Sequence, residues 1–188
     1  TEEILEIRKR NMLPSGAVHT FRKPLHVKKA SMQWVWDVED KQYLDALGGI
    51  VTISAGHNHP RIKQRIRSWM DEDRPQHTTT LYISEPVAEL ASRLVGISPE
   101  GLRRTFFTNS GSEANELAIL LARQYTKRTE ILALKHAYHG GTTGALSLVA
   151  QHTWKWGGPG LAGIVHAAQP NCYRCPWGAQ PGKCALEC

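Results

Sequence analysis

Cysteine is absent from the first 171 residues of this 188-residue chain, and all four cysteines lie in its last seventeen residues. A disulfide scaffold distributes cysteines among its loops, so the composition argues against that class. No apolar run approaches the length of a membrane-spanning helix. Thr1 to Arg10 is a charged amphipathic stretch without the apolar segment of a secretory signal. We therefore expect a cytoplasmic protein, while a trimmed targeting segment before Thr1 stays an open alternative.

Aromatic residues are also few, at 7%, and acidic residues are too few to balance the basic ones, which leaves a net charge of +6. Residues 1–30 carry seven basic and three acidic side chains. A further basic cluster consists of Arg61, Lys63, Arg65 and Arg67. Nucleic-acid-binding domains combine such patches with aromatic or helical reading elements. We interpret the charge as a solvated helix face that suits a phosphate-bearing cofactor, and we expect neither a nucleic-acid nor a membrane partner.

Helix and strand patterns alternate along most of the chain. A short helical pattern ends at Pro14, and Trp34 to Asp45 is predicted to form a small β-hairpin. The later elements are predicted to be helices near 62–70, 86–95 and 112–126 and strands near 104–108, 130–134 and 163–166. This alternation indicates a parallel α/β sheet. We expect residues 1–60 to form a smaller N-terminal unit and residues 61–188 the first part of a larger α/β domain.

The stretch from Thr108 to Asn115, T-N-S-G-S-E-A-N, joins a predicted strand to a predicted helix. Ser110 and Glu113 match a capping box. The N–H groups left over in the first helical turn, together with the helix dipole, favour phosphate binding, and Gly111 lets the backbone approach closely. A capped helix that binds nothing is the plainer alternative. Neither G-x-G-x-x-G nor G-x-x-x-x-G-K-[ST] is present, which disfavours dinucleotides and nucleoside triphosphates.

A second group of residues, K-H-A-Y-H-G-G at 135–141, directly follows the next predicted strand. The carboxyl ends of neighbouring parallel strands share one crevice, so we expect Tyr138 and His139 to face the phosphate turn. A tyrosine there can stack on a flat aromatic cofactor. Taken singly, each residue is more simply explained as a buried tyrosine and a surface histidine.

Together these motifs resemble the class III aminotransferases, the ornithine and 4-aminobutyrate type. T-N-S-G-S-E-A-N is followed by A-Y-H-G at the family's distance. Upstream, the segments 49–51 and 56–60 (G-H-N-H-P) and the hairpin match in kind and order, so the resemblance covers nearly the whole chain. It implies the type I fold of pyridoxal 5′-phosphate (PLP) enzymes, here a small-domain segment plus the first part of the large parallel-sheet domain, in a homodimer.

The resemblance also implies roles for individual residues. Those implied to bind PLP are Ser110, Gly111, Ser112, Tyr138 and His139, the first three at the phosphate and the last two at the ring. Ile50 would line the substrate side of the pocket, and Gly56 to Pro60 would lie near the subunit interface. His57 and His59 have no carboxylate or cysteine partner nearby in the sequence, so we expect turn and interface residues and not metal ligands.

The implied activity is transfer of an amino group from an amino acid or ω-amine to a 2-oxo acid. In the family, the lysine that bonds to the cofactor lies later in the large domain, so we expect it beyond Cys188 and expect this chain alone to be inactive. Ornithine- and 4-aminobutyrate-type members often have an arginine where this chain has Gly141. Specificities for alanine with glyoxylate, for phosphorylated amines and for other ω-amino groups therefore stay open.

The four cysteines form the pattern C-x2-C-x8-C-x3-C at Cys172, Cys175, Cys184 and Cys188. Four thiolates at short spacing can bind zinc, although the middle gap is shorter than in common zinc ribbons, and reduced free thiols are the simpler expectation. Three alternatives to an aminotransferase stay open. They are a PLP-dependent phospho-lyase, racemase or aminomutase of the same family, a zinc-stapled basic binding module, and a non-catalytic phosphate-binding domain.

Overall fold

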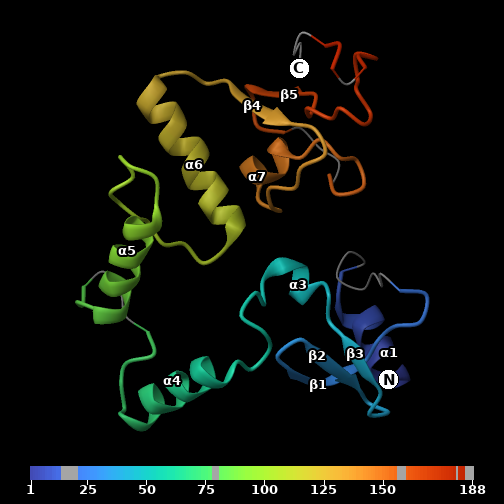
Figure 1. Cartoon of the computed structure of the whole chain (residues 1–188), viewed down its shortest axis with the longest axis vertical. Coiled ribbons are helices and arrows are strands. Elements are labelled where there is room, and N and C mark those ends of the chain that lie inside the picture. Colours follow the sequence, from blue (N-terminus) through green and yellow to red (C-terminus); the bar gives the residue numbers. More distant parts are fainter. Residues whose placement is uncertain (14–20, 78–80, 156–159, 181, 185–188) are drawn as a thin grey trace. The chain divides into compact units, whose positions relative to one another are not determined.

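The computed structural model describes residues 1–13, 21–77, 81–155, 160–180 and 182–184. The chain divides into two compact units, Thr1–Ser84 and Glu85–Cys188, whose elements are labelled in Figure 1. The boundary that we predict at residue 60 concerns the domains of the family's fold and stays a prediction. Pro14, which is expected to end the first helix, lies outside the described residues.

The first unit is built around a small antiparallel sheet. Its elements are α1 (Glu2–Asn11), β1 (Val27–Ser31), β2 (Trp34–Asp37), β3 (Gln42–Leu44), α3 (Gly48–Val51) and α4 (Pro60–Asp71). The predicted hairpin is confirmed, because β2 pairs antiparallel with β3 and Val35 lies opposite Tyr43. Asp37 holds the turn: its Oδ1 accepts the N–H groups of Glu39 and Lys41, and its Oδ2 accepts the Tyr43 hydroxyl. The unpredicted strand β1 pairs with the other edge of β2.

The chain leaves this sheet through a left-handed turn at α3. Gly48, Gly49, Ile50 and Val51 have φ angles of 58°, 60°, 60° and 63°. Two hydrogen bonds close the turn, from the Val51 N–H to the Leu47 carbonyl (3.0 Å) and from the Thr52 N–H to the Gly48 carbonyl (2.9 Å). The left-handed conformation costs an L-residue with a side chain about 1–2 kcal/mol. The side chains of Ile50 and Val51 are each 78% exposed, so packing among the described residues does not offset this cost.

The second unit contains α5 (Glu85–Ile97), α6 (Gly111–Thr126), β4 (Ile131–Leu134), α7 (Thr143–Leu148) and β5 (Ile164–Ala167). β4 and β5 pair in parallel, with Ile131 opposite Ile164, which confirms the predicted parallel pairing. In Figure 1, α6 and α7 lie beside this strand pair. Their shared core consists of Ile119 from α6, Ala133 from β4 and Leu148 from α7. The helix α7, which the sequence does not predict, buries four of its six residues.

The predicted strand from Arg104 to Thr108 is wrong, since these residues form no strand in the structure. A strand exists only when a partner receives its backbone hydrogen bonds. β4 pairs with β5, and no described segment pairs with residues 104–108. Phe106 and Phe107 satisfy the local preference for strands, yet both side chains are exposed.

Glu116 joins α6 to the first turn of α7. Its Oε1 accepts the N–H groups of Gly144 (2.7 Å) and Ala145 (3.2 Å). The hydrogen bond with the Thr142 side chain, followed by those from the two N–H groups, lowers the pKa of the Glu116 carboxyl from its ordinary 4.5, and burial opposes this shift without reversing it. A carboxylate at a helix N-terminus is favourable because it also complements the helix dipole.

Replacing Glu116 by glutamine tests this link between the helices. The ionised carboxylate stabilises the fold above pH 4.5, and its contribution is lost as the pH falls through the lowered folded-state pKa. We expect Glu116→Gln to reduce the free energy of unfolding at pH 7 by about 1 kcal/mol. The difference from the unmodified protein should shrink below pH 4.5. Denaturant unfolding at several pH values measures both effects.

Glu89→Gln serves as the control for this experiment. The Glu89 side chain is 64% exposed and pairs with Arg93 one turn along α5, so its removal should change little. Equal losses from the two variants at pH 7, or a loss in Glu116→Gln that does not vary with pH, would contradict the proposed role of Glu116.

Candidate functional site

The first turn of α6 forms a capped and partly unpaired helix N-terminus. Ser110 is the N-cap residue, and its Oγ accepts the Glu113 N–H at 3.2 Å. Glu113 returns a hydrogen bond, but its Oε2 accepts the N–H of Asn109 (2.7 Å) and not that of Ser110, so the predicted capping box forms with this change. The N–H groups of Gly111 and Ser112 have no acceptor among the described residues. Two backbone donors and the positive end of the helix are therefore available to an anion.

Gly111 lies in open space at this turn. A Cβ atom placed on it would meet no atom of the described structure within 4 Å. Its φ is not positive, so the backbone does not require glycine either. Neither packing nor conformation within the described structure explains a glycine here, and the open position fits the close approach of a ligand to the backbone.

The loop after β4 lies directly against this turn. The Gly141 N–H donates to Ser112 Oγ (3.1 Å), and the Asn115 side-chain amide donates to the His139 carbonyl (2.6 Å). Gly140, with φ of 130°, comes so close that a Cβ atom on it would lie 2.9 Å from the Ser112 Cα. The two motifs therefore lie together, as the sequence predicts, while their roles toward a cofactor stay predictions.

Tyr138 carries an exposed ring, and His139 carries a ring nitrogen without a partner among the described residues. The Tyr138 side chain is 59% exposed, and its ring meets the Trp154 ring edge to face, with the centroids 5.6 Å apart. The His139 Nε2 atom is buried and has no hydrogen-bond partner among the described residues. A buried polar atom without a partner is costly, so it marks a place where a ligand could supply one. No local pattern in the sequence indicated Trp154.

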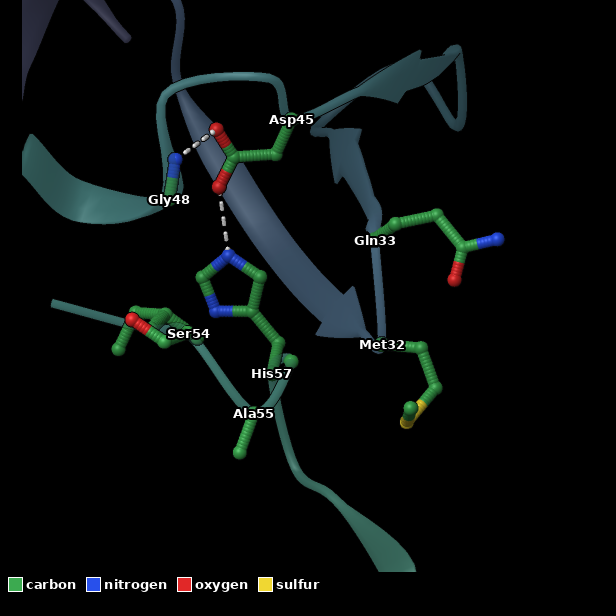
Figure 2. Close-up of a pocket in the computed structure, with 9 residues that line it drawn as sticks. Met32, Gln33, Asp45, Gly48, Ser54, Ala55 and His57 are labelled. Atoms are coloured by element: carbon green, nitrogen blue, oxygen red, sulfur yellow. Dashed lines mark hydrogen bonds and ion pairs between the residues drawn. The ribbon is translucent and has the colours of Figure 1, made fainter. Parts of the chain in front are cut away.

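A cavity of about 330 Å³ lies in the first unit (Figure 2). The residues that line it are Met32, Gln33, Asp45, Gly48, Ile53, Ser54, Ala55, Gly56 and His57. His57 Nε2 lies 2.7 Å from Asp45 Oδ2. The fold thus gives His57 a carboxylate partner twelve positions away in the sequence, while its expected place at a turn near the subunit interface stays a prediction. Ile50 is not among the lining residues, and its predicted place on the substrate side stays a prediction.

Asp45 is a hydrogen-bond acceptor among the residues that line this cavity. The hydrogen bond from His57, followed by the one from the Gly48 N–H, lowers the pKa of the Asp45 carboxyl below its ordinary value. The side chains of Asp45 and His57 are both only partly exposed. The carboxylate is therefore the ionised form near neutral pH, and it can accept several hydrogen bonds at once.

The cysteine segment forms a second, much smaller cavity of about 30 Å³. Cys172, Cys175 and Cys184 all line it. Within the described ranges, no group of three or more histidine, cysteine or acidic side chains is placed to hold a metal ion. Cys188 lies outside those ranges, so the predicted four-thiolate zinc site stays a hypothesis that metal analysis of the purified protein would decide.

The chain matches the family described as aminotransferase class-III over residues 16–187. It belongs to the class III aminotransferase family. Human mitochondrial alanine–glyoxylate aminotransferase 2 is 39% identical over 180 residues, which cover 93% of this chain and 34% of the human protein. Leucine/methionine racemase of Thermococcus litoralis is 35% identical over 191 residues, which cover 100% of this chain and 42% of the racemase.

A solved structure shows the same fold. Taurine:2-oxoglutarate aminotransferase from Bifidobacterium kashiwanohense, in complex with PLP and glutamate, has a TM-score of 0.77 and 33% identity to this class III chain, covering 92% of it and 39% of the enzyme. The predicted type I fold is thereby confirmed. The chain spans about a third of the length of the human relative that it matches. No helix in the described parts is long and apolar enough to cross a membrane.

Replacing Gly140 by alanine tests the contact that joins the two motifs. The new methyl group would collide with Ser112, and the φ of 130° is unfavourable for any residue with a side chain. We expect the free energy of unfolding to fall by about 2 kcal/mol, whereas Gly141→Ala should have little effect because its Cβ would meet nothing within 4 Å. Calorimetry on both variants provides the comparison, and equal melting temperatures would show that the loop can relax away from α6.

Proposed function

We propose that this protein is a PLP-dependent aminotransferase that moves an amino group from an amino acid or ω-amine to a 2-oxo acid. The observation that carries the proposal is the junction of the α6 first turn with the loop at residues 138–141, where unpaired N–H groups, an exposed tyrosine ring and a buried histidine nitrogen lie in one region. Membership of the class III family supports the same activity.

The first turn of α6 suits the phosphate group of PLP. The N–H groups of Gly111 and Ser112 would bind its oxygens, with the helix dipole adding to the attraction. The Ser112 hydroxyl oxygen accepts the Gly141 N–H, and the Ser110 hydroxyl oxygen accepts the Glu113 N–H. Each hydroxyl still has its own proton to donate, so both serines can bind an anion while holding the loop and the cap.

Tyr138 and His139 would hold the ring of the cofactor. Trp154 meets the Tyr138 ring edge to face, which restrains the tyrosine, and Tyr138 would stack on the pyridine ring. His139 would bond through its unpartnered Nε2, while its backbone is fixed by Asn115. When bound, PLP supplies an electron sink for the substrate carbon that loses a proton. The residues of this chain bind and orient the cofactor.

The quaternary structure, location and substrate side are further parts of the proposal. The family resemblance supports a homodimer, with Gly56 to Pro60 near the subunit interface and Ile50 on the substrate side. We place the protein in the cytoplasm, although the human relative is named as mitochondrial. Similarity to alanine–glyoxylate aminotransferase 2, and Gly141 in place of arginine, support alanine and glyoxylate as the first substrates to test.

A racemase is the second candidate, because a leucine/methionine racemase aligns with the whole chain at 35% identity. The two activities differ in what they need. An aminotransferase requires a 2-oxo acid to accept the amino group, whereas a racemase inverts an amino acid without any acceptor.

The activity test uses the protein encoded by its native gene, supplied with PLP. We expect pyruvate to form from L-alanine in amounts exceeding the enzyme and its PLP only when glyoxylate or another 2-oxo acid is present. Chiral chromatography of alanine, leucine and methionine without a 2-oxo acid checks for racemisation. Inversion without an acceptor would replace the aminotransferase with the racemase, and neither reaction over a panel of amino acids and ω-amines would overturn the proposal.

Gly111→Ala tests the phosphate site directly. The methyl group has free space within the chain, so folding should be unaffected or slightly favoured by the helix preference of alanine. We expect PLP affinity to fall roughly tenfold because the methyl group occupies the path of the ligand to the N–H groups. Equilibrium titration with PLP and the melting temperature without PLP give the two quantities.

Gly96→Ala is the matched control for this substitution. Gly96 is an exposed residue of α5, and a Cβ atom placed on it would meet nothing within 4 Å, so it shares the helix effect without the site. PLP affinity that is unchanged in Gly111→Ala, or lowered equally in Gly96→Ala, would show that the first turn of α6 does not hold the phosphate.

A further inference from the structure

The left-handed turn at Gly48–Val51 presents two β-branched side chains in a conformation that they disfavour. Ile50 and Val51 have φ angles of 60° and 63°, and both residues are largely exposed. Strained backbone of this kind persists only where surrounding groups hold it in place. The groups that hold this turn are therefore candidates for a functional role.

Asp45 is the residue that fixes the start of the turn. Its Oδ1 accepts the N–H groups of Leu47 (3.1 Å) and Gly48 (2.9 Å), the last residue before the turn and the first within it. Its Oδ2 accepts from His57 Nε2 at 2.7 Å. Figure 2 shows the carboxylate between the Gly48 N–H and the His57 ring. One carboxylate thus connects the turn to a histidine on a separate segment.

His57 is itself anchored to the sheet through its backbone. The Met32 N–H donates to the His57 carbonyl (2.7 Å), and the His57 N–H donates to the Met32 carbonyl (2.8 Å). Gly56 permits this approach, because a Cβ atom on it would lie 3.1 Å from the Met32 Cα. Among the described residues that line the cavity, Asp45 and His57 alone have ionisable side chains.

We propose that Asp45 and His57 form a positioning pair that holds Ile50 and Val51 in the left-handed turn and so sets how the amino donor binds. Backbone pairing with Met32, between β1 and β2, fixes His57. The His57 ring fixes the Asp45 carboxylate, and the carboxylate fixes the start of the turn. The inference rests on the proposed function, in which Ile50 lines the substrate side. It adds two residues that touch neither the substrate nor the cofactor.

The variants His57→Ala and Asp45→Ala break the pair, whereas His57→Gln keeps an N–H donor at the reach of Nε2. In the protein from its native gene, we expect both alanine variants to raise KM for the amino donor roughly tenfold, because small displacements of positioning groups are costly. The value of kcat and the affinity for PLP should change little. His57→Gln should bring KM back close to its value in the unmodified protein. His77→Ala, at an exposed histidine of the same unit, should leave KM unchanged.

A double-mutant comparison separates positioning from general structural support. In an Ile50→Ala background, His57→Ala should add little to KM, because the side chain proposed to line the substrate side is already gone. A roughly tenfold increase on top of Ile50→Ala, an unchanged KM in His57→Ala, or a lack of rescue by His57→Gln would each overturn the proposal.

Hydrogen exchange keeps this test separate from the activity. Exchange of the Val51 and Thr52 amides should be faster in His57→Ala than in the unmodified protein and near normal in His57→Gln, whether or not the protein transfers amino groups. Unchanged exchange would show that the pair does not hold the turn. Absence of transamination in the unmodified protein, with faster exchange in the variant, would instead overturn the proposed function and leave the pair as a support of the turn alone.

Discussion

Gly140 approaches Ser112 more closely than a residue with a side chain can, and the candidate site depends on this contact. It brings the loop after β4 onto the first turn of α6, where the Gly141 and Asn115 hydrogen bonds secure it. The same loop leads into α7, whose first N–H groups are held by Glu116 of α6. One helix therefore provides an N-terminus with N–H groups unpaired among the described residues, a support for the loop and a cap for the next helix.

The first unit is organised by a different constraint. Its small sheet fixes His57 by backbone pairing with Met32. The Asp45 carboxylate bonds both the His57 ring and the Gly48 N–H at the start of the left-handed turn. In both units a glycine permits a close backbone approach, and a side-chain acceptor then fixes the neighbouring segment. Few of the described side chains are fully buried.

The sequence predicts the elements whose signals are local. The Ser110 and Glu113 cap marked the start of α6, and helical periodicity located α4 and α5. The sequence does not predict β1, because Val27–Ser31 has no alternation of apolar and polar residues. It does not predict α7 either, because the capping acceptor of that helix, Glu116, lies 28 positions before Gly144. It failed at residues 104–108, where local preference favoured a strand that has no partner among the described segments. It could not foresee the Asp45–His57 pair or the turn at Ile50, because both are imposed by tertiary contacts against local preference.

The donors at the first turn of α6 have one more consequence. They are backbone N–H groups and serine hydroxyls, none of which gains or loses a proton at ordinary pH. A phosphate bound there would meet donors of constant charge, so these donors would add no pH dependence of their own to its binding. Such a site would bind a phosphate through fixed dipoles, and added salt would weaken that binding less than binding to a cluster of exposed lysines.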